Sequence, residues 1–310
     1  MQLLPILKGV ATWVPVLYDP KRHGTGGTVS ARYCYSVWLR HLALLEACGL
    51  PTHYESVAEL GPGDSLGISL AALLTGSNRV DTLDVVRYAN TPHNLEVLAQ
   101  LARMLGAREP IPDERELPLV YPRLRSYAFP DFLDERRLEA ALQDQRVERI
   151  AAAVSGASSD VSVTYYVPWQ DCWKPEAGGA DLLISQAALE HVEDIEGVQR
   201  SLAAGLRIGG IASHVIDFKS HGMTPTWDGH LEYGDALWKV VKGHRPFLLN
   251  RRSPSEHLQA MRRSGFEIIR TERVTASPTI PRAHLNPAFR DRSEEDRSTT
   301  DMVVVARRVR

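Results

Sequence analysis

The sequence contains little cysteine. Three cysteines stand among 310 residues, and no two of them have the CxxC spacing of a zinc or redox motif: Cys34, Cys48 and Cys172. Disulfide scaffolds and zinc ribbons need more cysteines at closer spacing, so both classes are excluded. The scarcity favours a reducing compartment, and we therefore expect a cytoplasmic protein.

Long apolar runs and an excess of one charge are also missing. No uncharged apolar stretch reaches the roughly 18 residues that a membrane-spanning helix requires. Lysine and arginine (36) nearly balance aspartate and glutamate (38), which leaves a formal net charge of −2. Binding of nucleic acid through bulk positive charge is therefore not expected. We predict a protein with no membrane span and no nucleic-acid partner.

The hydrophobic pattern that is present alternates strands with helices. Apolar runs at 56–60 and 79–86 predict buried strands, and helical patterns follow them at 66–76 and 92–106. Strand, helix, strand, helix within about 50 residues indicates a parallel α/β sheet. Further strands are predicted at 161–167, 180–185, 211–218, 266–274 and 301–309.

Two segments interrupt this alternation. Residues 108–157 are rich in proline and charge and include a charged helix over 133–153, which we interpret as a cap over a cleft. Residues 219–252 mix aromatic and polar side chains before the last helix. We therefore expect an N-terminal helical extension over 1–54, followed by an α/β domain over 55–310 with these two insertions.

A glycine-rich turn joins the first predicted strand to its helix. It carries Glu59, Gly61, Gly63 and Gly67, with leucine at position 66. Glycine lets a backbone turn sharply and approach a ligand closely, and the start of a helix presents free N–H groups. A dinucleotide-binding turn needs G-x-G-x-x-G, so its third glycine would stand at position 66 instead of 67.

The form E-x-G-x-G-x-x-x-G resembles the first motif of class I S-adenosylmethionine-dependent methyltransferases. Residues 185–194 are similar to the family's LEHV segment after the fourth strand, and Gly209 and Gly210 resemble its turn before the fifth strand. The resemblance covers about half of the chain and extends to members that act on small molecules and sugars. It implies a Rossmann-like, seven-stranded, mostly parallel sheet with an antiparallel last strand, helices on both faces, and S-adenosylmethionine as the cofactor.

The resemblance also assigns residues to the cofactor. Asp84 would accept hydrogen bonds from both ribose hydroxyls, and Glu59 would help to hold the ammonium group directly or through water. The expected cofactor contacts are Glu59, Gly61, Gly63, Gly67, Asp84, Val85, Ser185 and Gln186. Because the family's Asp-Ala pair after the third strand is absent, three aromatic residues are alternatives for flanking the adenine or for packing in the core: Tyr165, Tyr166 and Trp169.

Polar residues follow the fourth and fifth strands, at the edge where ligands bind in open α/β sheets. A hydroxyl acceptor must lose a proton as it attacks, and a histidine or carboxylate can take that proton. The candidate catalytic residues are therefore His191, Asp217 and His221, with His191 favoured as the base. His214 lies within its strand and is expected in the core.

The acceptor is expected to be a small molecule. Aromatic residues in the second insertion favour a sugar or glycoside and hence O-methylation: Trp227, Tyr233 and Trp238. No metal is expected, because the histidines and aspartates there lack a fixed ligand spacing. Two alternatives stay open, namely an NAD-dependent oxidoreductase or epimerase, which Leu66 disfavours, and a non-catalytic binding protein with a degenerate methyltransferase fold. Whether the chain forms a homodimer also stays open.

Overall fold

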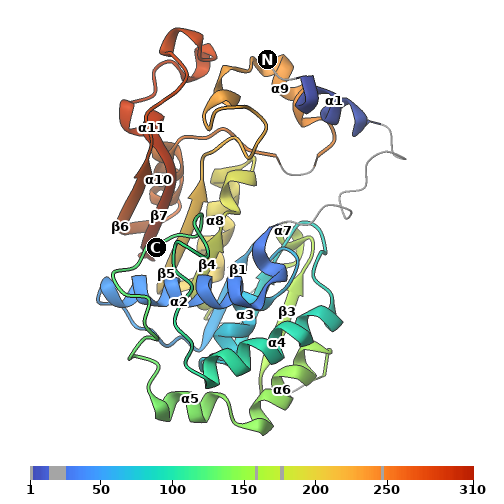
Figure 1. Ribbon diagram of the computed structural model, residues 1–310, viewed down its shortest axis with the longest axis vertical. Coiled ribbons are helices and arrows are strands. Elements are labelled where there is room, and N and C mark those ends of the chain that lie inside the picture. The colour runs from blue at the N-terminus through green and yellow to red at the C-terminus, as the bar shows by residue number, and fades with distance from the viewer. Residues whose placement is uncertain (1–2, 14–25, 158–159, 175–177, 246–247) are drawn as a thin grey trace.

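Seven strands form one sheet in the computed structural model, which describes residues 3–13, 26–157, 160–174, 178–245 and 248–310 (Figure 1). The strands are β1 (Ser56–Leu60), β2 (Arg79–Leu83), β3 (Ser162–Tyr166), β4 (Ala180–Gln186), β5 (Leu206–Asp217), β6 (Phe266–Thr275) and β7 (Thr299–Arg308). Their order is β3-β2-β1-β4-β5-β7-β6, and β7 pairs antiparallel with both β5 and β6. The pairs β3-β2, β2-β1, β1-β4 and β4-β5 are parallel. The expected mostly parallel sheet with an antiparallel last strand is confirmed.

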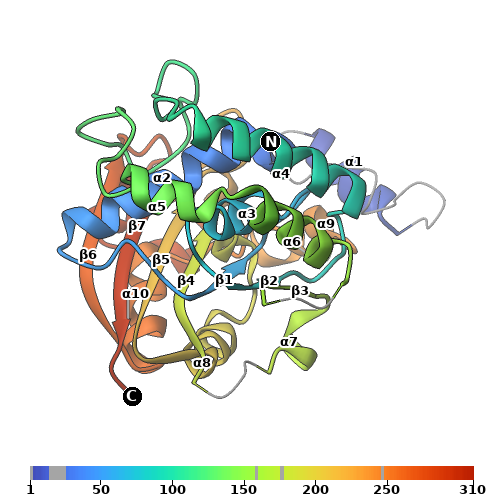
Figure 2. The same cartoon turned by 90° about the horizontal axis from the view of Figure 1, so that it is seen from below.

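Helices cover both faces of this sheet, as Figure 2 shows from below. One face carries α2 (Ala31–Ala47), α3 (Gly67–Leu73) and α4 (Thr91–Gly106), with α5 (Glu135–Ala141) and α6 (Asp144–Val154) beside them. The other face carries α7 (Trp169–Cys172), α8 (Ile195–Gly205) and α10 (Pro254–Arg263). The remaining helices are α1 (Leu3–Ala11), α9 (Asp235–Lys242), α11 (Glu294–Ser298) and the 3-10 helices η2 (Gly27–Val29), η3 (Leu189–His191), η4 (Gly229–Glu232), η5 (Arg282–His284) and η6 (Pro287–Phe289).

The core follows the alternation of side chains along each strand. Val57 of β1 and Leu182 of β4 join the apolar cluster under α2, α3 and α4. Their neighbours Ala58 and Leu183 join a second cluster under α8 and α10. Because successive side chains of a strand point to opposite faces, a strand buried on both faces is mostly apolar, and Glu59 is the charged exception in β1.

The N-terminal helix α1 lies away from α2 and packs against α9, so two segments far apart in sequence lie side by side near the top of Figure 1. Residues 1–2 and 14–25 of the expected extension, and 246–247 of the expected second insertion, lie outside the described residues. Within the described ranges no helix is both long and apolar enough to cross a bilayer.

The charged segment at 133–153 is two helices, α5 and α6, and the expectation of one continuous helix is wrong. Arg137 donates to the carbonyl of Thr75, at 3.0 Å, and Arg146 donates to the carbonyl of Ser77, at 2.6 Å. Thr75 and Ser77 lie shortly before β2, which begins at Arg79, so these helices are fixed near the amino end of that strand. The segment therefore lies at the edge of the sheet opposite to the carboxyl ends of the parallel strands.

Candidate active site

A cleft of about 1180 Å³ lies at the carboxyl ends of the parallel strands. The segments that follow β1, β2, β4 and β5 contribute residues 60–63, 83–85, 186–188, 191–194 and 221–223 to its walls. Ligands of open α/β sheets bind at this edge, so the cleft is the candidate active site. Residues 108–157 do not line it, and the expectation that this insertion caps the cleft is wrong.

Most residues expected at the site are brought together there. Those that line the cleft are Gly61, Gly63, Asp84, Val85, Gln186, His191 and His221. Those that do not line it are Glu59, Gly67, Ser185 and Asp217. The residues of the second group lie beneath the cleft wall, and each of them contacts other residues inside the protein.

Glu59 is a buried residue of β1, with 2% of its surface exposed. Its Oε2 accepts hydrogen bonds from the backbone N–H and the hydroxyl of Ser69, at 3.0 and 2.5 Å, which ties β1 to α3. Burial raises the pKa of Glu59 to about 7, although the hydrogen bonds from Ser69 lower it. In this geometry the carboxyl group holds the helix that follows the turn.

Gly67 and Ser185 also hold the site from behind. A Cβ at Gly67 would lie 2.5 Å from Sγ of Cys34 and 2.9 Å from Cγ1 of Val97, so glycine there allows α2, α3 and α4 to pack closely. Oγ of Ser185 lies 2.8 Å from Nδ1 of His214, which is fully buried. The expectation that His214 is a core residue is confirmed.

The glycine turn bends at two residues with positive φ. Gly61 has φ 76° and Gly63 has φ 69°, a region that side chains disfavour. A Cβ on Gly61 would also lie 2.7 Å from Cβ of Ala188, a residue in the segment after the neighbouring strand β4. Glycine at position 61 is therefore required both by the backbone and by the narrow space.

The backbone N–H groups that follow this turn donate hydrogen bonds to side chains of the protein. Asp64 N donates to Oγ1 of Thr28 (2.9 Å). Leu66 N donates to Oδ1 of Asn94 (3.0 Å), and Gly67 N donates to Oγ of Ser65 (3.1 Å). A phosphate held by a glycine-rich turn needs such N–H groups to point at the ligand. Here they are already engaged, and α3 offers no open set of donors.

Asp84 stands where β2 ends. Its Oδ1 accepts a hydrogen bond from the backbone N–H of Val85 at 2.7 Å, and the residue lines the cleft. Burial raises the pKa of Asp84 to about 6, and the N–H groups of Val85, Val86 and Gly63 partly offset that rise. The carboxylate is thus fixed in orientation and ionises near neutral pH, which suits an acceptor for ligand hydroxyls.

At the other end of the cleft a histidine is paired with a carboxylate. Nε2 of His221 lies 3.3 Å from Oδ2 of Asp217, whose Oδ1 lies 3.0 Å from Nζ of Lys219. Burial alone would raise the pKa of Asp217, but the hydrogen bond from His221 and the charge of Lys219 outweigh it and lower the pKa. Lys219 also pairs with Asp301 at 2.5 Å. Asp217 is therefore ionised and can orient the ring of His221.

His191 lies next to this pair. The ring centroids of His191 and His221 are 5.3 Å apart, and Nδ1 of His191 is buried without a partner among the described residues. Burial and the neighbouring His221 lower the pKa of His191 to about 4. His191 is thus neutral at neutral pH and holds a proton poorly.

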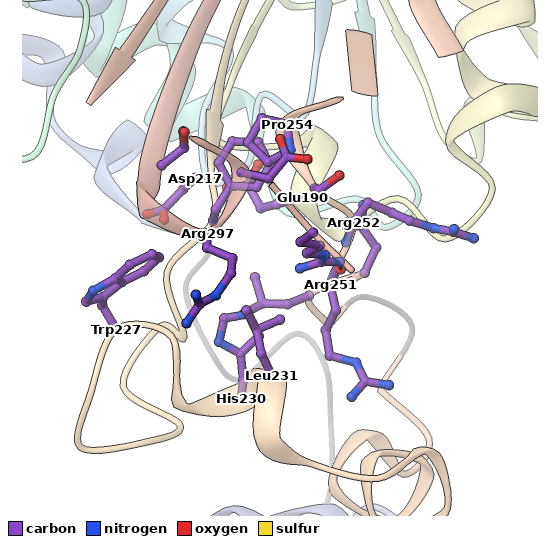
Figure 3. A pocket seen from close by; sticks show the side chains of 16 residues that line it. Glu190, Asp217, Trp227, His230, Leu231, Arg251, Arg252, Pro254 and Arg297 are labelled. Carbon is purple, nitrogen blue, oxygen red and sulfur yellow. Dashed lines mark hydrogen bonds between the residues drawn. The ribbon is translucent and has the colours of Figure 1, made fainter. Parts of the chain in front are cut away.

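A second cavity, of about 20 Å³, lies behind the His221–Asp217 pair (Figure 3). Glu190 and Asp217 line it together with Arg251, Arg297 and Trp227. The carboxyl oxygens of Glu190 are buried without hydrogen-bond partners among the described residues, and burial raises the pKa of Glu190 well above its usual value. The cavity has room for about one water molecule, so it is no site for an acceptor.

The aromatic residues expected to bind a sugar lie outside the main cleft. Nε1 of Trp227 donates to the carbonyl of Ser277 at 3.2 Å. Tyr233 and Trp238 are buried, and the guanidinium of Arg251 lies 4.6 Å from the ring of Trp238. These side chains stabilise the second insertion and offer no stacking face to the cleft.

The extension contributes residues that the sequence did not predict. Tyr33 and the segment 26–28 line the cleft beside the glycine turn, and four residues of α1 line its other end: Leu4, Pro5, Lys8 and Ala11. The run Gly24-Thr-Gly-Gly-Thr28 before α2 was the available signal for the first group. Of the three aromatic alternatives for the adenine contact, Trp169 lines the cleft. In the described part of the chain no three His, Cys, Asp or Glu side chains are grouped so as to hold a metal ion.

No family model and no curated protein matches the chain. Among solved structures, an S-adenosylmethionine-dependent methyltransferase from Mesorhizobium loti is similar over 86% of this chain and 96% of its own, at 19% identity and a TM-score of 0.42. A geranyl diphosphate methyltransferase in complex with S-adenosylmethionine is similar over 88% and 85%, at 15% identity and a TM-score of 0.45. The [4+2]-cyclase SpnF is similar over 87% and 79%, at 13% identity and a TM-score of 0.42.

Proposed function

We propose that the protein is an S-adenosylmethionine-dependent methyltransferase that methylates a hydroxyl group of a small molecule. One observation carries the proposal: a single cleft is lined by the glycine turn, by Asp84 and by His221, and His221 pairs with Asp217 behind the wall. Its volume, about 1180 Å³, exceeds the ~300–1,000 Å³ of a typical pocket for one ligand. The cleft therefore has room for a cofactor and an acceptor side by side.

The glycine turn and Asp84 fit this cofactor. The positive φ of Gly61 and Gly63 lets the backbone approach the amino acid part of the cofactor, and Asp84 is in position to accept hydrogen bonds from ribose hydroxyls. A dinucleotide would in addition need N–H donors for its pyrophosphate. Because the N–H groups of Asp64, Leu66 and Gly67 are engaged, the geometry favours a cofactor without phosphate.

When bound, S-adenosylmethionine supplies a methyl group that is electrophilic enough to react with an oxygen nucleophile. The protein's task is then to orient the acceptor and to take its proton, and orientation alone can contribute ~7–11 kcal/mol. His221 is suited to take the proton, because a hydrogen bond from Nε2–H to Asp217 leaves Nδ1 as the acceptor. The ionised Asp217 then stabilises the imidazolium that forms.

His191 is the weaker candidate for the base, although the sequence favours it. With its pKa at about 4, a proton placed on His191 would be lost readily at neutral pH. We assign His191 the role of a neutral hydrogen-bonding contact in the wall of the cleft. Glu59, Gly67 and Ser185 act behind the site, by fixing the elements that carry the turn and β4.

Co-crystallisation with S-adenosylhomocysteine tests the proposal. We expect density in the cleft, with the amino acid part at Gly61–Gly63, the ribose hydroxyls at Asp84 and the sulfur directed toward His221. Soaking with NAD is the matched comparison. Absence of S-adenosylhomocysteine together with ordered NAD would contradict the proposal and favour the oxidoreductase alternative.

A further inference from the structure

The acceptor end of the cleft is walled by apolar side chains from four separate segments. They come from α1, from the loops after β4 and β5, and from the strip that follows α9: Leu4, Pro5, Ala11, Val192, Met223, Leu248 and Leu249. Met223 and Leu249 are buried, with 9% and 4% of their surfaces exposed. Among the described residues of the second insertion, Trp227, Tyr233 and Trp238 take no part in this wall.

Helix α1, which contributes part of this wall, is held in place where its Gly9 packs closely against α9. A Cβ on Gly9 would overlap the carbonyl oxygen of Val240 and lie 2.6 Å from that of Val241, so only glycine lets the two helices approach this closely. The hydroxyl of Thr12 accepts a hydrogen bond from His244 N at 2.8 Å, just beyond Gly243. α1 is therefore positioned by specific packing at a contact away from the cleft.

The charged residues along this end are unequal in sign. Lys8 and Arg245 line the cleft, from α1 and from the residues after α9. The two acidic residues beside them are engaged with the protein. Glu193 forms an ion pair with Lys242, and Asp194 accepts a hydrogen bond from Gly197 N at 2.8 Å as the cap of α8. Arg245 interacts with another group of the protein, so Lys8 is the residue that presents a cation to a ligand at this rim.

We propose that the acceptor is a hydroxyl compound with an apolar body and one anionic group, which Lys8 contacts at the rim. Sugar hydroxyls placed against this wall would lose water without gaining partners, at a cost of about 1–3 kcal/mol for each unpaired group. An apolar body gains from the same burial. The inference rests on the proposed function for the reaction, but the binding preference of the pocket is measurable without turnover.

Two fluorescent probes that differ in one group test this preference. Anilinonaphthalene sulfonate has an apolar body and a sulfonate, whereas phenylnaphthylamine has the same rings without the charge. Each is titrated into the protein saturated with S-adenosylhomocysteine, whose own affinity is measured separately by calorimetry. We expect one saturable site for both probes and tighter binding of the sulfonate. Methyl glucoside at high concentration is expected to displace neither.

Variants then locate the probe site. Lys8→Gln is expected to lower the affinity for the sulfonate probe by about two- to five-fold, which is the effect of losing an exposed ion pair. The affinity for the neutral probe should stay unchanged. Gly9→Leu undocks α1 without changing a side chain of the cleft, and is expected to weaken both probes by about 10-fold or more. Gly243→Val, on the facing side of the same contact, provides an independent second variant.

Leu7→Ala is the matched control, because Leu7 is 62% exposed on α1 and does not line the cleft. It is expected to leave both probe affinities unchanged. If probe affinity falls in Leu7→Ala but not in Gly9→Leu or Gly243→Val, the probe binds the outer face of α1 and the inference is overturned. Displacement of the probes by methyl glucoside would also overturn it, and so would the absence of a saturable site. If the unaltered protein does not bind S-adenosylhomocysteine, that result would instead contradict the proposed function.

Discussion

Nε2 of His221 lies 3.3 Å from Oδ2 of Asp217, and the two side chains connect the cleft to the charged interior behind it. His221 itself has a positive φ of 49°, a conformation that costs a residue with a side chain about 1–3 kcal/mol. The charged pair Asp217–Lys219 behind the ring holds the carboxylate ionised and in place. On the proposed function, this pairing orients His221 to take the proton of the acceptor.

Replacement of His221 by alanine should remove the base. We expect turnover with a hydroxyl acceptor to fall by about 10²–10⁴-fold, because general base catalysis contributes that much. The affinity for S-adenosylhomocysteine should stay within about two-fold, since Asp84 and the glycine turn lie at the other end of the cleft. Steady-state kinetics and calorimetry on the same preparation measure both quantities.

Asp217→Asn should also lower turnover, but by less than His221→Ala does. The imidazole of His221 remains in this variant, although it has lost its charged partner. His284→Ala is the control, since His284 is exposed on η5, outside the residues that line the cleft. Normal turnover in His221→Ala, with a large loss in His191→Ala instead, would return the role of base to His191.

Gly61→Ala should impair the cofactor end of the cleft. The new Cβ would lie 2.7 Å from Cβ of Ala188, and φ at this position is 76°. We expect weaker binding of S-adenosylhomocysteine and a loss of about 1–3 kcal/mol in the free energy of unfolding. Gly156→Ala is the matched control, because Gly156 has φ 90° but no atom within 4 Å of an added Cβ. The same loss of affinity in Gly156→Ala would show that strain alone, and not the narrow turn, is responsible.

Binding of S-adenosylhomocysteine should depend on pH through Asp84. The pKa of this carboxyl is raised to about 6 by burial, and its ionised form is the better acceptor for ribose hydroxyls. Affinity should therefore be constant above pH 7 and fall by up to about 10-fold per pH unit below pH 6. Calorimetry at several pH values measures the profile, and Asp84→Asn should flatten it. A flat profile in the unaltered protein would remove Asp84 from the contact.

The buried His257 should make the protein sensitive to acid. Burial lowers its pKa from 6.5 to about 4, and neither ring nitrogen has a hydrogen-bond partner among the described residues. Between these values the unfolded state binds more protons, so stability is lost as pH falls. The contribution is about 2 kcal/mol between pH 7 and pH 5. His257→Leu should reduce the loss by that amount in urea unfolding, whereas His284→Leu should not change it.

The fold was predictable because central strands such as β1 are buried on both faces. The predicted strand at 56–60 matches β1. The helix at 133–153 was predicted as one because charge and helix propensity continue across Leu142 and Gln143. The helix is interrupted because Arg137 and Arg146 form hydrogen bonds with backbone carbonyls of the residues before β2, which are distant in the sequence.

The candidate site was predictable in part. Residues that follow strands were found, because topology places strand ends together. The roles of Glu59 and Gly67 depend on contacts with Ser69 and Cys34, which no local pattern shows. The acceptor wall was missed for the same reason, because α1 is held at the cleft by a contact with α9, which is distant in the sequence.

The most direct test of the central claim is calorimetric titration of S-adenosylmethionine into the protein, with Asp84→Ala and NAD as comparisons. Loss of a hydrogen bond to a charged group costs about 1.5–3 kcal/mol, so Asp84→Ala should weaken binding by roughly 10- to 150-fold. Asp131→Ala, at an exposed aspartate in the first insertion, should leave it unchanged. We predict binding of S-adenosylmethionine and none of NAD. Binding of NAD, or an equal affinity for S-adenosylmethionine in folded Asp84→Ala, would contradict the assignment of this cleft.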